Sequence, residues 1–71
     1  MHDIILFSSH CAQCTMVENL LNKKNLSYSI VDSEEDYMPI AEENNIRSMP
    51  FAMVDGKIMK TKDLLAFIKA Q

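Results

Sequence analysis

Four consecutive apolar residues near the start of the chain, Ile4–Phe7, limit the folds that are open to this sequence. A strand with one face in water alternates apolar and polar side chains, whereas an unbroken apolar run is typical of a central strand covered on both faces. A chain of 71 residues makes one domain. The sequence therefore predicts a single domain, residues 1–71, in which helices cover both faces of a small sheet.

Periodicity predicts a β-α-β unit in the first half of the chain. The apolar run belongs to a strand over His2–Phe7, and apolar residues at helical spacing predict a helix over Ala12–Lys24. Alternating apolar and polar residues then predict a half-buried strand over Leu26–Val31. Strands that are joined through a helix in this way are parallel, with a right-handed crossover.

A short helix and a hairpin are expected next. Pro39 should lie in the first turn of a helix that ends near Asn44, because the missing N–H of proline costs little there. The only glycine lies in Asp55-Gly56, a pair typical of the two-residue turn of a hairpin. The strands on either side are Phe51–Val54 and Lys57–Met59.

The last helix is expected to have Thr61 as its N-cap and to bury a broad apolar face. The element order is therefore β-α-β-α-β-β-α. Methionines at apolar positions of these elements are expected to fill the core, which explains them better than a cofactor does. These methionines are Met16, Met38, Met53 and Met59.

The only two cysteines, Cys11 and Cys14, follow the first predicted strand at the start of a helix. Thiols at this spacing can close a small disulfide, and a helix N-terminus favours a thiolate at the first sulfur. The loop between them is too short for a disulfide to stabilise the fold much. The pair therefore indicates electron transfer between dithiol and disulfide. We expect Cys11 to be the nucleophile and the more exposed and more acidic thiol, with Cys14 as the resolving thiol.

Charge and hydropathy restrict the partners of the chain. Its net charge is -3 at pH 7, and acidic residues cluster at positions 32–36 and 42–43, as on a solvated surface. This balance argues against nucleic-acid binding through a basic stripe. No segment resembles a secretory signal or reaches the roughly 20 apolar residues of a membrane span. We therefore expect a cytoplasmic monomer that binds neither nucleic acid nor membrane.

Over nearly its whole length the chain resembles the glutaredoxins and the small glutaredoxin-like redoxins that serve ribonucleotide reductase. The resemblance rests on the element order and on three segments: Cys11-Ala12-Gln13-Cys14, Ser48-Met49-Pro50 and Asp55-Gly56-Lys57. It implies a thioredoxin-like, glutaredoxin-type α/β fold, a three-layer sandwich with the first strand central in a four-stranded mixed sheet. It also implies a cis proline facing the dithiol, and a thiol–disulfide oxidoreductase acting on protein or small-molecule disulfides.

The resemblance and the chemistry of the side chains together predict a substrate-binding set beside the two cysteines. His10 can favour a thiolate when protonated or act as a base when neutral, unless it is simply an exposed loop residue. The amide of Gln13 can contact substrate or can be exposed without a role. The predicted set is His10, Gln13, Arg47, Ser48, Met49, Pro50, Thr61, Lys62 and Asp63.

Several positions depart from the pattern of the glutaredoxins. Ser8 replaces a lysine, Ala12 and Gln13 replace proline and tyrosine, and Lys60-Thr61 replaces a glycine pair that approaches glutathione. These changes weigh against glutathione as the reductant, although Arg47, Lys60, Lys62 and Asp63 can still hold a small zwitterionic thiol by charge and helix-end contacts. A thioredoxin reductase-like flavoprotein is the alternative donor. No tightly bound cofactor is expected, and ribonucleotide reductase exemplifies the implied protein substrates.

Two other classes of function are compatible with the cysteines. A zinc site needs about four ligands, and only His10 and His2 are candidates to join the pair. An iron–sulfur cluster shared between two subunits, as some glutaredoxins hold with glutathione, is the other metal-binding alternative. A redox-inert adaptor that uses an exposed strand edge is the third class. The dithiol favours the oxidoreductase, with no metal ligand among the predicted site residues.

Overall fold

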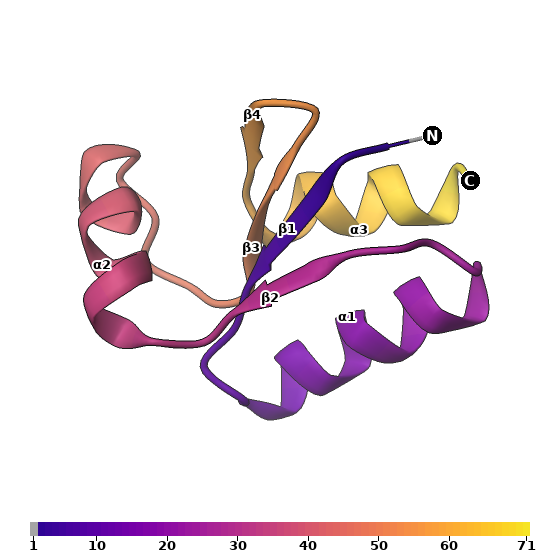
Figure 1. The fold of residues 1–71 in the computed structure, drawn as a ribbon, viewed down its shortest axis with the longest axis horizontal. Helices are drawn as coiled ribbons and strands as arrows, with labels where there is room; N and C mark the ends of the chain where they lie inside the picture. The colour runs from indigo at the N-terminus through magenta and orange to yellow at the C-terminus, as the bar shows by residue number, and fades with distance from the viewer. Residues whose placement is uncertain (1) are drawn as a thin grey trace.

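Three helices and four strands make up the computed structural model, which describes residues 2–71 (Figure 1). Met1, the first residue of the predicted domain, lies outside the described residues. The elements are β1 (Ile4–Phe7), α1 (Ala12–Lys23), β2 (Ser29–Val31), α2 (Glu34–Glu43), β3 (Phe51–Val54), β4 (Lys57–Met59) and α3 (Thr61–Lys69). None of the helices in this part of the chain is long and apolar enough to cross a membrane.

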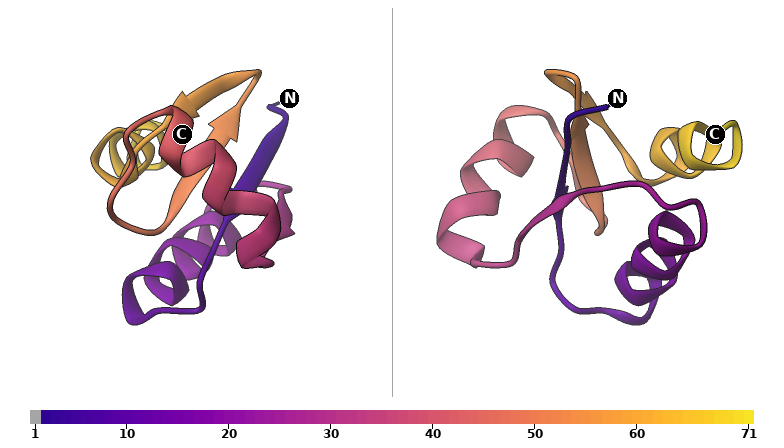
Figure 2. Two further views of the ribbon diagram at one scale, coloured as in Figure 1. Left: turned by 90° about the vertical axis from the view of Figure 1, so that its left-hand side faces the viewer. Right: turned by 45° about the vertical axis from the view of Figure 1, so that its right-hand side comes forward.

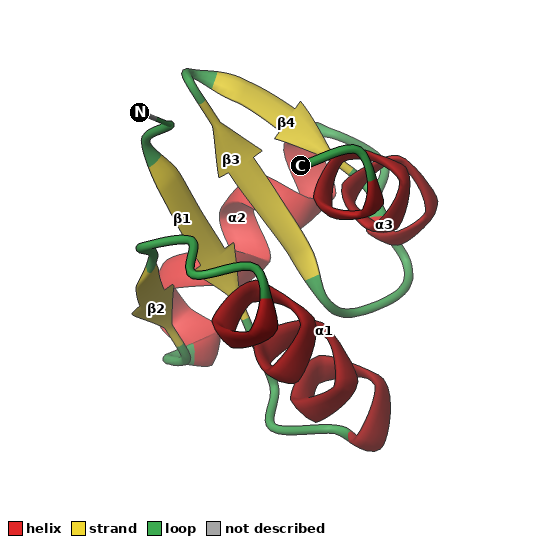
Figure 3. Ribbon diagram, turned by 90° about the vertical axis from the view of Figure 1, so that its right-hand side faces the viewer, coloured by secondary structure: helices red, strands yellow, loops and turns green. Residues whose placement is uncertain are grey.

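The sheet has the strand order β2-β1-β3-β4, so β1 is an interior strand. It runs parallel to β2 and antiparallel to β3, and β3 pairs with β4 in the hairpin. Helix α2 covers one face of the sheet, and α1 and α3 cover the other (Figures 2 and 3). The predicted element order, the central first strand and the three-layer α/β sandwich are confirmed.

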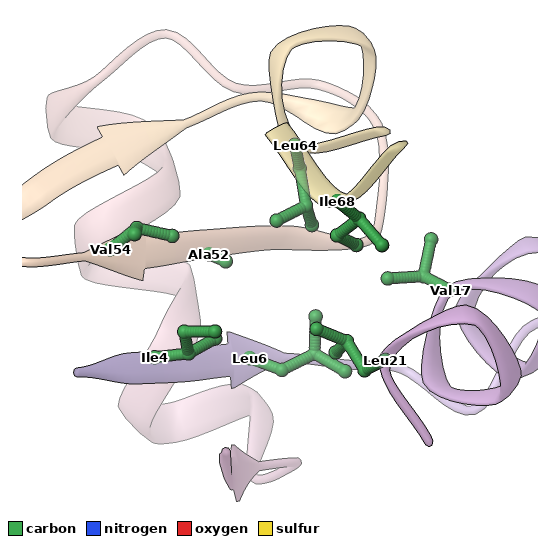
Figure 4. Packing of buried hydrophobic residues seen from close by; sticks show 8 residues of the cluster. All are labelled: Ile4, Leu6, Val17, Leu21, Ala52, Val54, Leu64 and Ile68. Atoms are coloured by element: carbon green, nitrogen blue, oxygen red, sulfur yellow. The ribbon is translucent and has the colours of Figure 1, made fainter. Parts of the chain in front are cut away.

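The unbroken apolar run of β1 supplies both cores. Ile4 and Leu6 belong to the cluster that α1 and α3 cover, and Figure 4 shows Leu6 beside Leu21 of α1. Phe7 belongs to the second cluster, on the α2 side. Successive residues of a strand point to opposite faces, so a strand covered on both sides cannot contain a polar position. That is why the run does not alternate.

Asparagines in the left-handed conformation end the first two helices. Asn25 follows α1 with a φ of 57°, and the N–H of Leu26 then donates to the carbonyl of Leu21 at 3.0 Å. Asn45 ends α2 in the same way, with a φ of 56°. Asparagine adopts this conformation more readily than most residues, so each stop is encoded locally.

The regular elements are shorter than the hydrophobic pattern predicted. The first strand begins at Ile4 rather than His2, the first helix ends at Lys23 rather than Lys24, and β2 contains only Ser29–Val31. Leu26 and Tyr28 pack against the α1 and α3 core without joining the ladder. Apolar packing and strand pairing are separate interactions, and a sequence pattern reports only the first.

Two methionine predictions and one cap prediction are wrong. Met16 and Met38 are 44% and 38% exposed and therefore do not fill the core. The N-cap of α3 is Lys60, whereas Thr61 is the first helical residue. The hydroxyl of Thr61 donates instead to the carbonyl of Pro50, so the residue links α3 to the loop before β3.

Pro39 lies in the second turn of α2, because the helix begins at Glu34, earlier than predicted. Its ring removes one intrahelical hydrogen bond and crowds the preceding turn. The exposed acidic residues Glu34, Glu35 and Asp36 occupy the first turn and favour the helix there through its dipole. The start of α2 is therefore set by this acidic turn rather than by the proline.

Replacing this proline should stabilise the protein. Pro39→Ala restores a backbone donor at an exposed position, and we expect a gain of about 1–2 kcal/mol in the free energy of unfolding. Pro39→Gly is the matched variant: it also restores the N–H but should gain less, because glycine costs about 1 kcal/mol in a helix. Urea unfolding measures both, and a less stable Pro39→Ala variant would contradict this account.

The Asp55 carboxylate in the hairpin turn binds residues at the start of the chain. Asp55 has a φ of 51°, and its Oδ1 accepts the N–H of Asp3 at 2.9 Å. Its Oδ2 lies 2.7 Å from Nδ1 of His2. The backbone hydrogen bond from Asp3, followed by the hydrogen bond to His2, lowers the pKa of Asp55.

The carboxylate should therefore stabilise the fold only while it is ionised. Because the pKa of Asp55 is lower in the folded state, its contribution is complete above the unfolded value and is lost as the pH falls through the folded value. Asp55→Asn keeps a side-chain oxygen that can accept the N–H of Asp3, and asparagine tolerates the positive φ. We expect this variant to be less stable than the parent near about pH 7 and equal to it near about pH 2. Urea unfolding at both pH values tests this, with Glu43→Gln as a control for the lost charge.

Candidate active site

The loop between β1 and α1 is held by a buried serine. Ser8 is fully buried, and its N–H donates to the carbonyl of Val31 at 3.0 Å. Its Oγ accepts the N–H of His10 at 3.1 Å. His10 takes a φ of 59°, which turns the chain into α1. The sequence marks Ser8 only as a departure from a family pattern and does not predict this role.

Cys11 is the N-cap of α1, and its sulfur performs the capping. Sγ of Cys11 accepts the N–H of Cys14 at 3.1 Å, as a serine oxygen would at this position. The two Sγ atoms lie 2.6 Å apart, and both cysteines are free thiols. The spacing therefore brings both sulfurs to the first turn of the helix, as the sequence indicated.

The two thiols differ in accessibility. Cys11 is half-buried, whereas Cys14 is fully buried, with no exposed surface. A bulky disulfide can reach only a sulfur that solvent reaches, so Cys11 is the one positioned for intermolecular attack. Cys14 is positioned to attack Cys11 from inside.

Ionisation of the dithiol is favoured at physiological pH. Burial raises the pKa of Cys14, but hydrogen bonds from the Cys11 thiol, the Ser9 backbone and the Ser8 side chain outweigh it and lower the value to about 7. The thiol of Cys11 donates its hydrogen bond to Sγ of Cys14 across 2.6 Å. The sequence does not identify Cys14 as a thiol with a lowered pKa.

The loop before β3 contacts Sγ of Cys11, the more accessible of the two sulfurs. The carbonyl of Met49 lies 3.9 Å from Sγ of Cys11, and the Met49–Pro50 peptide bond is cis. Pro50 is fully buried, and Met49 packs against the α2 core. The resemblance implied this cis proline beside the dithiol, and the structure has it there.

His10 points to a partner that the sequence analysis did not identify. Its Nε2 lies 2.8 Å from Oδ2 of Asp32, which follows β2. This hydrogen bond raises the pKa of His10, and the charge of Cys14 acts in the same direction. The side chains of His10 and Asp32 are 64% and 56% exposed, so solvent screens the pair. His10 is thus the hydrogen-bond partner of Asp32 and lies next to Cys11 in the sequence.

A groove with a volume of about 450 Å³ lies beside the dithiol. It is lined by Gln13, Ser48, Lys60, Thr61, Lys62 and Leu65. Four of these residues belong to the predicted substrate-binding set, whereas Lys60 and Leu65 do not. Arg47 and Asp63 of that set are exposed neighbours in the sequence that do not line the groove. The Lys-Thr-Lys sequence at the start of α3 was the available signal for Lys60.

Most of the chain matches a known protein family. A family model described as "Thioredoxin domain" matches residues 2–61. The chain belongs to the thioredoxin domain family. Neither a curated protein nor a solved structure matches it. A Cys-x-x-Cys dithiol at the start of the first helix of a thioredoxin domain indicates a redox function.

Metal ligands do not gather in the described structure. Within residues 2–71, no three side chains of His, Cys, Asp or Glu lie close enough to hold one metal ion. His2 lies at the hairpin end, bound to Asp55, and cannot join the cysteines. A metal ion at Cys11 and Cys14 would therefore need further ligands from another molecule.

Alkylation should report both the accessibility and the ionisation of the pair. Reduced protein treated with limiting iodoacetamide should first be modified at Cys11, because Cys14 is fully buried. The rate should rise with pH, because iodoacetamide reacts with the thiolate rather than with the thiol. Peptide mapping identifies the modified residue. Earlier labelling of Cys14 would reverse the assignment of nucleophile and resolving thiol.

Proposed function

We propose that this protein is a thiol–disulfide oxidoreductase of the glutaredoxin type that reduces protein or small-molecule disulfides through Cys11 and Cys14. The proposal is supported above all by one observation. The two free sulfurs lie 2.6 Å apart in a thioredoxin domain, one half-exposed and the other buried beneath it. A dithiol arranged in this way can donate electrons to an external disulfide and become an internal one.

The exchange proceeds in two steps. The Cys11 thiolate attacks one sulfur of the substrate disulfide, and the other substrate sulfur leaves as a thiolate and takes up a proton. The Cys14 thiol then loses its proton and attacks Sγ of Cys11, which forms the Cys11–Cys14 disulfide and releases the second substrate sulfur as a thiolate that takes up a proton. Counted from the protonated dithiol, two electrons and two protons pass from the protein to the substrate.

Backbone groups can support both steps. The N–H of Cys14 donates to Sγ of Cys11 at 3.1 Å and stabilises negative charge there, both before attack and when Cys11 leaves. The carbonyl of Met49, 3.9 Å from the same sulfur, offers a hydrogen-bond acceptor to an extended substrate segment. The reaction thus requires no charged side chain in contact with the reacting sulfurs.

The electron donor and the substrate belong to the same proposal. A protein disulfide such as that of ribonucleotide reductase is the proposed substrate, with glutathione or a thioredoxin reductase-like flavoprotein as the donor. The replacement of the glycine pair by Lys60-Thr61 favours the flavoprotein. We propose that the protein acts as a monomer in the cytoplasm, where the reducing environment suits a dithiol donor. The two donors are distinguished by measuring the turnover of a disulfide substrate with glutathione and its reductase, and then with a thioredoxin reductase.

Two serine variants test the division of labour between the cysteines. Cys11→Ser should abolish reduction of a peptide disulfide, because no accessible nucleophile remains. Cys14→Ser should stop after the first step and accumulate a mixed disulfide through Cys11, visible as a mass increase that a reductant reverses. Equal loss of activity in both variants, without a trapped adduct in Cys14→Ser, would contradict the proposed mechanism.

A further inference from the structure

The groove beside the dithiol has the opposite charge to the rest of the protein. Among its six lining residues are two lysines, Lys60 and Lys62, and no acidic residue. The whole chain carries a net charge of -3. Neither lysine has a salt-bridge partner within residues 2–71, so both charges face the groove and solvent without neutralisation. Asp63 follows in the sequence but does not line the groove.

The groove adjoins the dithiol through residues on three segments. Gln13 lies between the two cysteines, and Ser48 precedes Met49, whose carbonyl is 3.9 Å from Sγ of Cys11. Thr61 donates a hydrogen bond to the carbonyl of Pro50. A molecule in the groove therefore lies beside the sulfur that forms the mixed disulfide.

The lining combines the contacts that a peptide segment requires. Leu65 is half-buried against the core and offers an apolar surface, whereas Gln13 and Ser48 offer polar groups. Because the groove is open to solvent and bordered by an exposed loop, a segment of a larger protein can enter it as readily as a small thiol can. The unpaired positive charge at one side selects for carboxylates.

We propose that the groove recognises an acidic segment of a partner protein, with Lys60 and Lys62 holding Asp or Glu side chains that flank the partner's disulfide. This inference rests on the proposed oxidoreductase function and names its substrate class. The substrate disulfide approaches Cys11 while the acidic residues beside it lie over the groove. The attraction raises the rate of encounter and favours one orientation of the disulfide.

The experiment uses three synthetic peptides that differ only in the residues flanking one intramolecular disulfide: glutamates, glutamines or lysines. The reduced protein is mixed with each peptide, and the second-order rate constant is measured by acid quench and mass spectrometry. We expect the glutamate peptide to react about tenfold faster than the lysine peptide at low salt. This ratio should fall towards one as salt screens the charges.

Paired charge variants assign the preference to the groove. Lys60→Gln with Lys62→Gln should bring the ratio of the glutamate to the lysine peptide close to one. Lys23→Gln with Lys69→Gln removes the same charge at the far ends of α1 and α3 and should keep the ratio of the parent protein. Circular dichroism confirms that both double variants are folded.

The outcomes separate this inference from the proposed function. If the glutamine peptide is not reduced at all, the oxidoreductase proposal fails. If it is reduced but the glutamate and lysine peptides react equally, or if the Lys60/Lys62 variant keeps the preference, only the acidic-segment proposal is overturned. Glutathione disulfide is the fourth probe. If it reacts faster than the glutamate peptide, and if the Lys60/Lys62 variant loses this advantage, the groove is a site for a small thiol and the proposal is overturned.

Discussion

Burial of β1 on both faces is the constraint on which the rest of the structure depends. A strand without a polar face must be covered twice, and a 71-residue chain can do so only by placing helices on each side of a small sheet. Leu6 is fully buried in the cluster on the α1 and α3 side of the sheet, and Phe7 is almost fully buried in the cluster on the α2 side. The strand that contributes to both cores also leads, through a short loop, to the dithiol at the start of α1.

The same pairing that builds the sheet assembles the site. Phe7 pairs with Phe51 in the antiparallel ladder, and their rings stack 4.6 Å apart. The residues after Phe7 and the residues before Phe51 therefore leave the sheet at the same end. This places Cys11 and Met49 in contact although 38 positions separate them in sequence. Slippage of this register would shift the Met49 loop away from Cys11 and turn core side chains to the wrong face.

Local and whole-chain patterns allowed the fold and the dithiol to be predicted, because each depends on spacing along the chain. Helix stops at Asn25, the Asp55-Gly56 turn and the Cys11–Cys14 spacing all act over a few residues. The features that were missed depend on distant parts of the chain. The contact of His10 with Asp32 requires the parallel pairing of β1 and β2. Similarly, the position of Leu65 in the groove requires the return of α3 to the Pro50 loop, which no periodicity reports.

The site divides into a part fixed by the fold and a part free to vary. The N–H of Cys14 donates to Sγ of Cys11, whereas the Cys11 thiol and the serines of the preceding loop hydrogen-bond to Cys14. All of these groups are held by elements that also carry the core. Changing these groups would disturb folding as well as chemistry. The groove residues Lys60 and Lys62 are exposed and contribute little to the core, so they can change without loss of the fold. Reactivity is therefore tied to stability, whereas the partner preference that we propose for the groove can change independently of both.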